Sequence, residues 1–146
     1  MKKTIAIISA VFILSGCSLL DAYKTSKYDS NEYFSVNQIR TIAEIAEPYC
    51  DTGTIDYSLI RQIYISSSLA VNYTQYLPEN EDSYELLKGL HNLVVGFKTQ
   101  YDNKGGQISK AYCSLKLNSI KRSAEKIQQV IGSKSRWNGY YYFGNG

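Results

Sequence analysis

The chain has 146 residues, of which 44% are hydrophobic and 20% are charged, and its net charge is +3. This composition excludes an intrinsically disordered chain. The length allows one domain with a modest core, but not two.

The first residues have the order of parts of a secretory signal peptide. Lys2 and Lys3 precede an apolar run over residues 4–12, and small residues follow. The run is too short to span a membrane, which takes about 20 apolar residues. The stretch Leu14-Ser15-Gly16-Cys17 then resembles the lipobox of bacterial lipoproteins.

The resemblance implies that residues 1–16 are removed and that Cys17 becomes a lipid-modified N-terminus, a covalent lipid being the only attached group expected. Two or more acyl chains hold a protein firmly on a membrane. Ser18 follows the cysteine, where an aspartate favours inner-membrane retention in Gram-negative lipoproteins. The resemblance therefore implies a periplasm-facing outer-membrane lipoprotein, palmitate being one fatty acid that such an anchor carries.

Removal of the signal peptide changes the charge balance. It leaves 14 basic and 13 acidic side chains, a net charge of +1. Residues 17–97 hold 5 basic and 11 acidic side chains, whereas residues 98–146 hold 9 and 2. This asymmetry indicates either an acidic partner or attraction between early and late helices within the fold. The basic residues of the last predicted helix do not cluster, which argues against nucleic acid as a partner.

Two further cysteines, Cys50 and Cys113, remain after Cys17. An isolated pair in an exported protein predicts a disulfide. The single histidine, His91, offers no metal-ligand cluster. We therefore expect a disulfide and neither a metal site nor a cofactor.

Apolar residues recur at helical spacing in four segments, which predicts an all-α fold, a small bundle of about four helices with one disulfide. The predicted helices cover residues 35–47, about 55–77, about 83–101 and about 107–131. Candidate caps stand at Ser35, Thr54 or Asp56, and Asp82 or Ser83, with Gly132 closing the last helix. The predicted organisation is a signal peptide (1–16), a flexible lipidated tether (17–34), a helical bundle (35–132) and a C-terminal tail (133–146).

Two helices carry features that predict their surroundings. The second helix is apolar on several sides, with Ile65, Leu69 and Tyr76 forming a stripe of their own. This pattern predicts a central helix. In the third helix Gly89 and Gly96 lie seven residues apart. Because glycine costs about 1 kcal/mol in a helix interior, the pair predicts close approach of a neighbouring helix.

The last ten residues contain five aromatic side chains and no charge. We call residues 137–143 the aromatic tail; its aromatic members are Trp137, Tyr140, Tyr141, Tyr142 and Phe143. Aromatic residues dominate contact hot spots and membrane interfaces. The tail is therefore a candidate partner-binding segment, with folding back onto the bundle as the alternative.

Motifs for catalysis are lacking in the sequence. It contains no HExxH, glycine-rich phosphate loop or nucleophile elbow. Residues 66–68 are three serines without a base nearby in sequence, and the S-x-x-K match at Ser123 and Lys126 lacks its accompanying motifs. The acidic residues near Glu79 suit a helix start. We therefore expect no enzyme activity.

A lipid-anchored helical domain without catalytic motifs is most simply a protein-binding module. At fold level it is similar to the secretion pilotins, which hold a peptide of an outer-membrane channel subunit between helices. That similarity implies a pilotin-like or envelope-assembly role, with the membrane and an envelope protein as partners. The alternatives are a phage or plasmid exclusion or immunity lipoprotein, and a structural envelope lipoprotein. The specific surface is expected away from the anchored end, on the helices or in the aromatic tail.

Overall fold

The structure is a computed structural model that describes residues 27–52 and 55–134. Its elements are α3 (Ser30–Ala46), the 3₁₀ helix η1 (Glu47–Thr52), α4 (Tyr57–Thr74), α5 (Glu81–Asn103) and α6 (Lys110–Ser133). The predicted all-α class, four helices and disulfide are confirmed. No helix in the described part is both long and apolar enough to cross a membrane.

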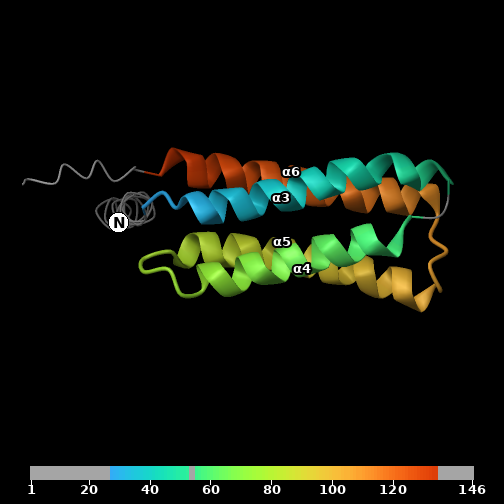
Figure 1. The fold of residues 1–146 in the computed structure, drawn as a ribbon, viewed down its shortest axis with the longest axis horizontal. Helices are drawn as coiled ribbons and strands as arrows, with labels where there is room; N and C mark the ends of the chain where they lie inside the picture. Colours follow the sequence, from blue (N-terminus) through green and yellow to red (C-terminus); the bar gives the residue numbers. More distant parts are fainter. Residues whose placement is uncertain (1–26, 53–54, 135–146) are drawn as a thin grey trace, which may run out of the picture.

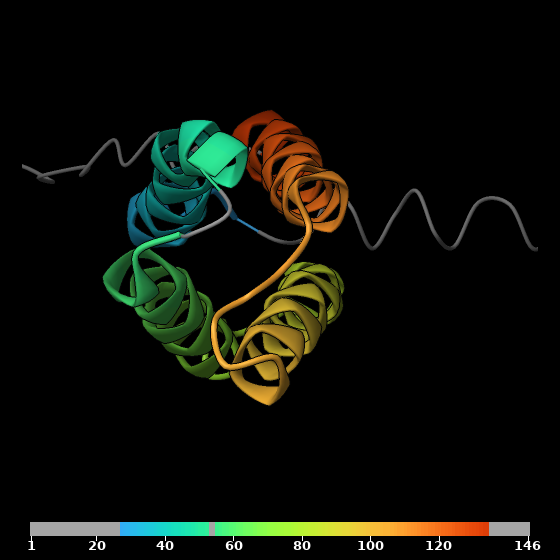
Figure 2. The ribbon, with the colours of Figure 1, turned by 90° about the vertical axis from the view of Figure 1, so that its right-hand side faces the viewer.

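The four long helices form an antiparallel bundle. Figure 1 shows successive helices running in opposite directions along the long axis. Figure 2 shows them at the corners of a square, where α3 lies between α4 and α6, and α5 lies opposite α3. We call the end at which α3 begins and α6 finishes the Lys27 end; the α4–α5 connection lies there too (Figure 1). The other end, with η1 and the α5–α6 connection, is the disulfide end.

Each helix turns one apolar stripe toward the axis of the bundle. The largest fully buried apolar side chains come from all four helices: Val36, Ile39, Ile60, Ile63, Leu87, Leu90, Val94, Phe97, Leu117, Ile120 and Ile131. Such burial of one face stabilises a helix far more than intrinsic propensity does. The Cys50–Cys113 disulfide joins η1 to the first turn of α6, with its Cα atoms 5.6 Å apart. It therefore fixes the disulfide end.

The bundle begins earlier than the sequence predicts. Asp29, not Ser35, caps α3, because its carboxylate accepts hydrogen bonds from the backbone N–H groups of Asn31 and Glu32, both at 2.8 Å. Ser35 lies inside the helix and its hydroxyl donates to the Asn31 carbonyl at 2.8 Å. The predicted tether boundary after residue 34 is therefore wrong, and residues 30–34 belong to the bundle.

Other helix ends also differ from the prediction. Asp56 caps α4, accepting from the Ser58 N–H at 2.8 Å, as predicted. α4 ends at Thr74, not near Leu77, and α5 begins at Glu81, preceded by Asn80 rather than by Asp82 or Ser83. α6 begins after Ser109 and includes Gly132, so this glycine is not its cap.

The prediction that the second helix is central is wrong. α4 occupies one corner of the square (Figure 2). In the second predicted stripe, Ile65 and Leu69 of α4 are 42% and 62% exposed, and Tyr76, which follows the end of α4, is 81% exposed. A four-helix square has no central position, so a helix with several apolar sides leaves one of them in solvent.

Candidate functional site

An apolar groove runs between α5 and α6 over the half of the bundle nearest the Lys27 end. Its volume is about 360 Å³. The residues that line this α5–α6 groove are Glu85, Leu86, Gly89, Leu90 and Leu93 of α5, and Ser123, Lys126, Ile127 and Val130 of α6. Ligand sites are commonly concave and apolar with a few polar groups at the rim, and the groove has this character.

Buried and exposed residues share the lining. Leu90 and Ile127 are almost fully buried, and they form the floor. Leu86 is 39% exposed, so one wall presents apolar surface to solvent. Glu85, Ser123 and Lys126 supply the polar groups of the lining. An apolar side chain of a ligand can therefore lie in the groove while the core residues beneath it keep their contacts.

A missing side chain keeps the groove open. A Cβ atom built at Gly89 would meet no heavy atom within 4 Å, and the same holds for Gly96. The prediction that these glycines permit close approach of a neighbouring helix is therefore wrong. Gly89 lines the groove, whereas Gly96 lies outside its lining. The two positions form a matched pair for experiments, since a larger residue fits at both.

The fold brings Ser67 of α4 and His91 of α5 together. Because they lie 24 residues apart on different helices, the sequence did not predict this contact. The Ser67 Oγ lies 2.9 Å from the His91 Nδ1 and 2.9 Å from the Tyr64 carbonyl oxygen. A carbonyl only accepts, so the hydroxyl donates to Tyr64 and the His91 Nδ1–H donates to Ser67. Burial lowers the pKa of His91 below its ordinary value.

This arrangement does not activate a nucleophile. An activated serine hands its proton to the histidine, whereas here the hydroxyl proton points to a backbone carbonyl. The Ser67 side chain is also buried, at 1% exposure. The pair satisfies polar groups between α4 and α5, which is what buried polar atoms require.

Four buried polar residues meet at the Lys27 end. The Lys134 ammonium lies 3.3 Å from the Glu32 carboxylate and also donates to Asn80 and Ser83. The Asn80 amide donates to the other Glu32 oxygen at 2.9 Å. This engagement explains why Asn80 makes no side-chain cap to α5. We call Glu32, Asn80, Ser83 and Lys134 the polar cluster; it ties the end of α6 to the start of α3.

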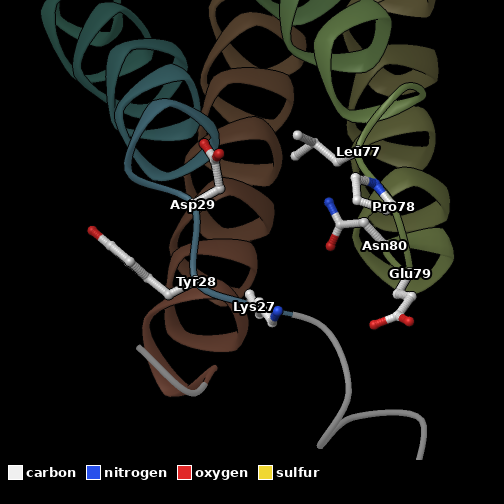
Figure 3. A pocket seen from close by; sticks show the side chains of 7 residues that line it. All are labelled: Lys27, Tyr28, Asp29, Leu77, Pro78, Glu79 and Asn80. Atoms are coloured by element: carbon white, nitrogen blue, oxygen red, sulfur yellow. The ribbon is translucent and has the colours of Figure 1, made fainter. Parts of the chain in front are cut away.

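A second hollow, of about 300 Å³, lies at the Lys27 end between residues 27–29 and the α4–α5 connection. Figure 3 shows Leu77, Pro78 and Asn80 facing this segment across a gap. The polar atoms of Asp29 and Asn80 are already engaged by α3, Tyr73 and the polar cluster. The hollow therefore offers a ligand less than the groove does.

The charge asymmetry has an explanation inside the fold. α6 forms ion pairs with the acidic early segment through Lys110 and Asp51 at 2.9 Å, Lys121 and Glu47 at 3.1 Å, and the polar cluster. This supports the internal alternative over an acidic partner. Within residues 27–52 and 55–134, no group of three His, Cys, Asp or Glu side chains is placed to hold a metal ion.

The remaining predicted site residues lie outside the described residues. These are Cys17 and the aromatic tail, Trp137, Tyr140, Tyr141, Tyr142 and Phe143. The structure does place the end of α6 at the same end of the bundle as the start of α3 (Figure 1), and Lys134 contacts Glu32 there. The expectation that the specific surface lies away from the anchored end concerns residues outside the described ranges, and it stays a prediction. No protein-family model, curated protein or solved structure matches the chain.

Proposed function

We propose that this protein is a lipid-anchored binding module of the bacterial envelope, without enzyme activity, that holds an apolar segment of another envelope protein in the α5–α6 groove. The observation that carries the proposal is the groove itself, an open apolar furrow between two helices. A furrow of this kind is the expected feature of a groove binder. It favours this function over the exclusion and structural alternatives, which do not require one.

The geometry of the groove suits one helical or extended segment. Recognition of an amphipathic helix in a groove uses side chains at positions i, i+3, i+4 and i+7. Leu86, Leu90 and Leu93 of α5 and Ile127 and Val130 of α6 line the groove, so the anchors of such a helix would meet apolar side chains from both helices. At about 360 Å³ the groove admits a few side chains and no more. Affinity then depends on a small number of apolar anchors.

The lipobox places this groove close to a membrane. The described chain starts at Lys27, and the groove lies in the half of the bundle nearest that end. Ten residue steps lead from Cys17 to Lys27, and they span at most about 35 Å. A partner segment in the groove would therefore be held within a short distance of the lipid surface, as an envelope-assembly role requires.

Filling the groove tests the proposal. In the full-length lipoprotein, Gly89→Leu places a side chain in the groove, while Gly96→Leu makes the same change seven residues away in the same helix. Both remove a helix-interior glycine, so both should favour the helix by about 1 kcal/mol. We expect Gly89→Leu to reduce co-purification of envelope proteins at least tenfold and Gly96→Leu to leave it unchanged. Equal co-purification with both variants would refute the proposal.

A further inference from the structure

The point at which the chain leaves α6 is fixed beside the α5–α6 groove. α6 ends at Ser133, and the ammonium of Lys134 is held in the polar cluster with the residue only 5% exposed. Val130 of the groove lies one helical turn before this point. Whatever follows Lys134 therefore starts within a short distance of an open apolar site.

The aromatic tail is long enough to fill that site. At 1.5 Å per helical residue, Val130 lies about 6 Å and Ser123 about 16 Å back along α6 from Lys134. An extended chain covers up to about 3.5 Å per residue, so Trp137 can reach about 10 Å from Lys134 and Phe143 about 30 Å. The tail can reverse direction and still run along the whole groove.

The chemistry of tail and groove also matches. The side chains of residues 137–143 carry no charge, so burial of the aromatic tail in an apolar groove strands no ionised side chain. At the rim, one Glu85 oxygen accepts from Lys88 at 3.3 Å and the other can accept from a phenol or indole donor, while the Lys126 ammonium can contact an aromatic face. The other hollow near Ser133, between α3 and α6, is lined largely by polar side chains, among them Arg40, Glu125 and Gln128. It fits an uncharged aromatic segment less well.

We infer that the aromatic tail is the intramolecular occupant of the α5–α6 groove and that a partner segment binds by displacing it. The regulatory part of this inference rests on the proposed function. A segment joined by a short linker has an effective concentration in the millimolar range. A tail that bound with a Kd of about 100 µM as a separate peptide would fill the groove about nine-tenths of the time. It would lower a partner's apparent affinity about tenfold.

The single tryptophan of the chain, Trp137, reports on this occupancy directly. The test uses residues 18–146 without the lipid, because detergent would compete for an apolar groove. We expect Trp137 fluorescence to be blue-shifted and several-fold protected from acrylamide quenching. Gly89→Leu should abolish both effects and Gly96→Leu neither, while circular dichroism checks that both variants keep the wild-type helix content. An exposed Trp137 in the wild-type chain, or a protected Trp137 that Gly89→Leu does not affect, overturns the inference.

A second measurement separates this inference from the proposed function. In the full-length lipoprotein the five aromatic residues of the tail are replaced by serine, which keeps the chain length. If the tail guards a partner site, this variant should capture about ten times more envelope protein than the wild type, and adding Gly89→Leu should remove the gain. If Trp137 is protected but capture never responds to either change, tail docking stands and the proposed function fails. If Trp137 is exposed while Gly89→Leu alone still reduces capture, the proposed function stands and tail docking fails.

Discussion

Replacement of Lys134 by methionine should destabilise the bundle more than any loss of a surface ion pair. The side chains of Lys134 and Glu32 are 2% and 0% exposed. Without the ammonium, the Glu32 carboxylate stays buried with the Asn80 amide as its remaining side-chain donor. Breaking a buried pair by removing one partner costs about 3–5 kcal/mol, because the other charge is left uncompensated. For a domain of this size, this corresponds to a fall in Tm of roughly 12–20 °C.

A matched control makes this prediction sharp. Lys110 and Asp51 form a shorter pair, at 2.9 Å, but their side chains are 67% and 66% exposed. Lys110→Met should therefore change the free energy of unfolding by less than about 0.5 kcal/mol. Thermal and urea unfolding at pH 7, followed by far-UV circular dichroism, measure both variants. If Lys134→Met costs no more than Lys110→Met, burial does not decide the strength of these pairs and the account of the polar cluster is wrong.

Three further predictions concern the disulfide, the first helix and the histidine. Joint replacement of Cys50 and Cys113 by alanine should lower the free energy of unfolding in urea by about 4 kcal/mol, since the bridge closes a loop of 63 residues; an unchanged midpoint would contradict this. Asp29→Ala should lower the free energy of unfolding by about 1 kcal/mol, because α3 loses its cap, and Ser35→Ala should lower it by less than half of that. A larger effect of Ser35→Ala would indicate that the helix begins at Ser35, as the sequence predicts. The NMR titration of His91 should give a pKa below its unfolded value of about 6.5. The unfolded chain then binds more protons, so wild-type stability should fall relative to His91→Gln as the pH drops below about 6.5. A parallel pH dependence of the two proteins would argue against a half-buried histidine whose pKa is lowered.

Sequence reasoning predicted what depends on local pattern. The apolar periodicity of each segment is set by its burial against one core, so the helix count followed directly. The pairing of Cys50 with Cys113 followed from the count of cysteines in a chain that its first residues predict to be exported. The start of α3 was missed because the cap is Asp29, which lies among scattered tyrosines without a clear period. The start of α5 was missed because Asn80 uses its side chain in the polar cluster and not as a cap.

The candidate site was beyond local pattern. The space between two neighbouring helices is filled or open according to how each helix is rotated about its axis. The periodicity of one helix does not give that rotation relative to its neighbour. A glycine such as Gly89 is compatible both with close helix packing and with open space, and only its neighbours in the fold decide between them. The contact between Ser67 and His91 joins residues on two helices in the same way. What the sequence alone supplied was the aromatic tail, an uncharged segment whose composition suits the groove beside its point of exit.

The most direct test of the central claim, that an apolar segment occupies the α5–α6 groove, is site-specific photo-crosslinking in intact cells. A photoreactive side chain is introduced at Gly89 or, as the control, at Gly96 of the full-length protein, since both positions have room for it. We expect position 89 to crosslink strongly to the aromatic tail or to one envelope protein, and position 96 to do so at least tenfold less. Equal yields at the two positions, or no product at position 89, would contradict it.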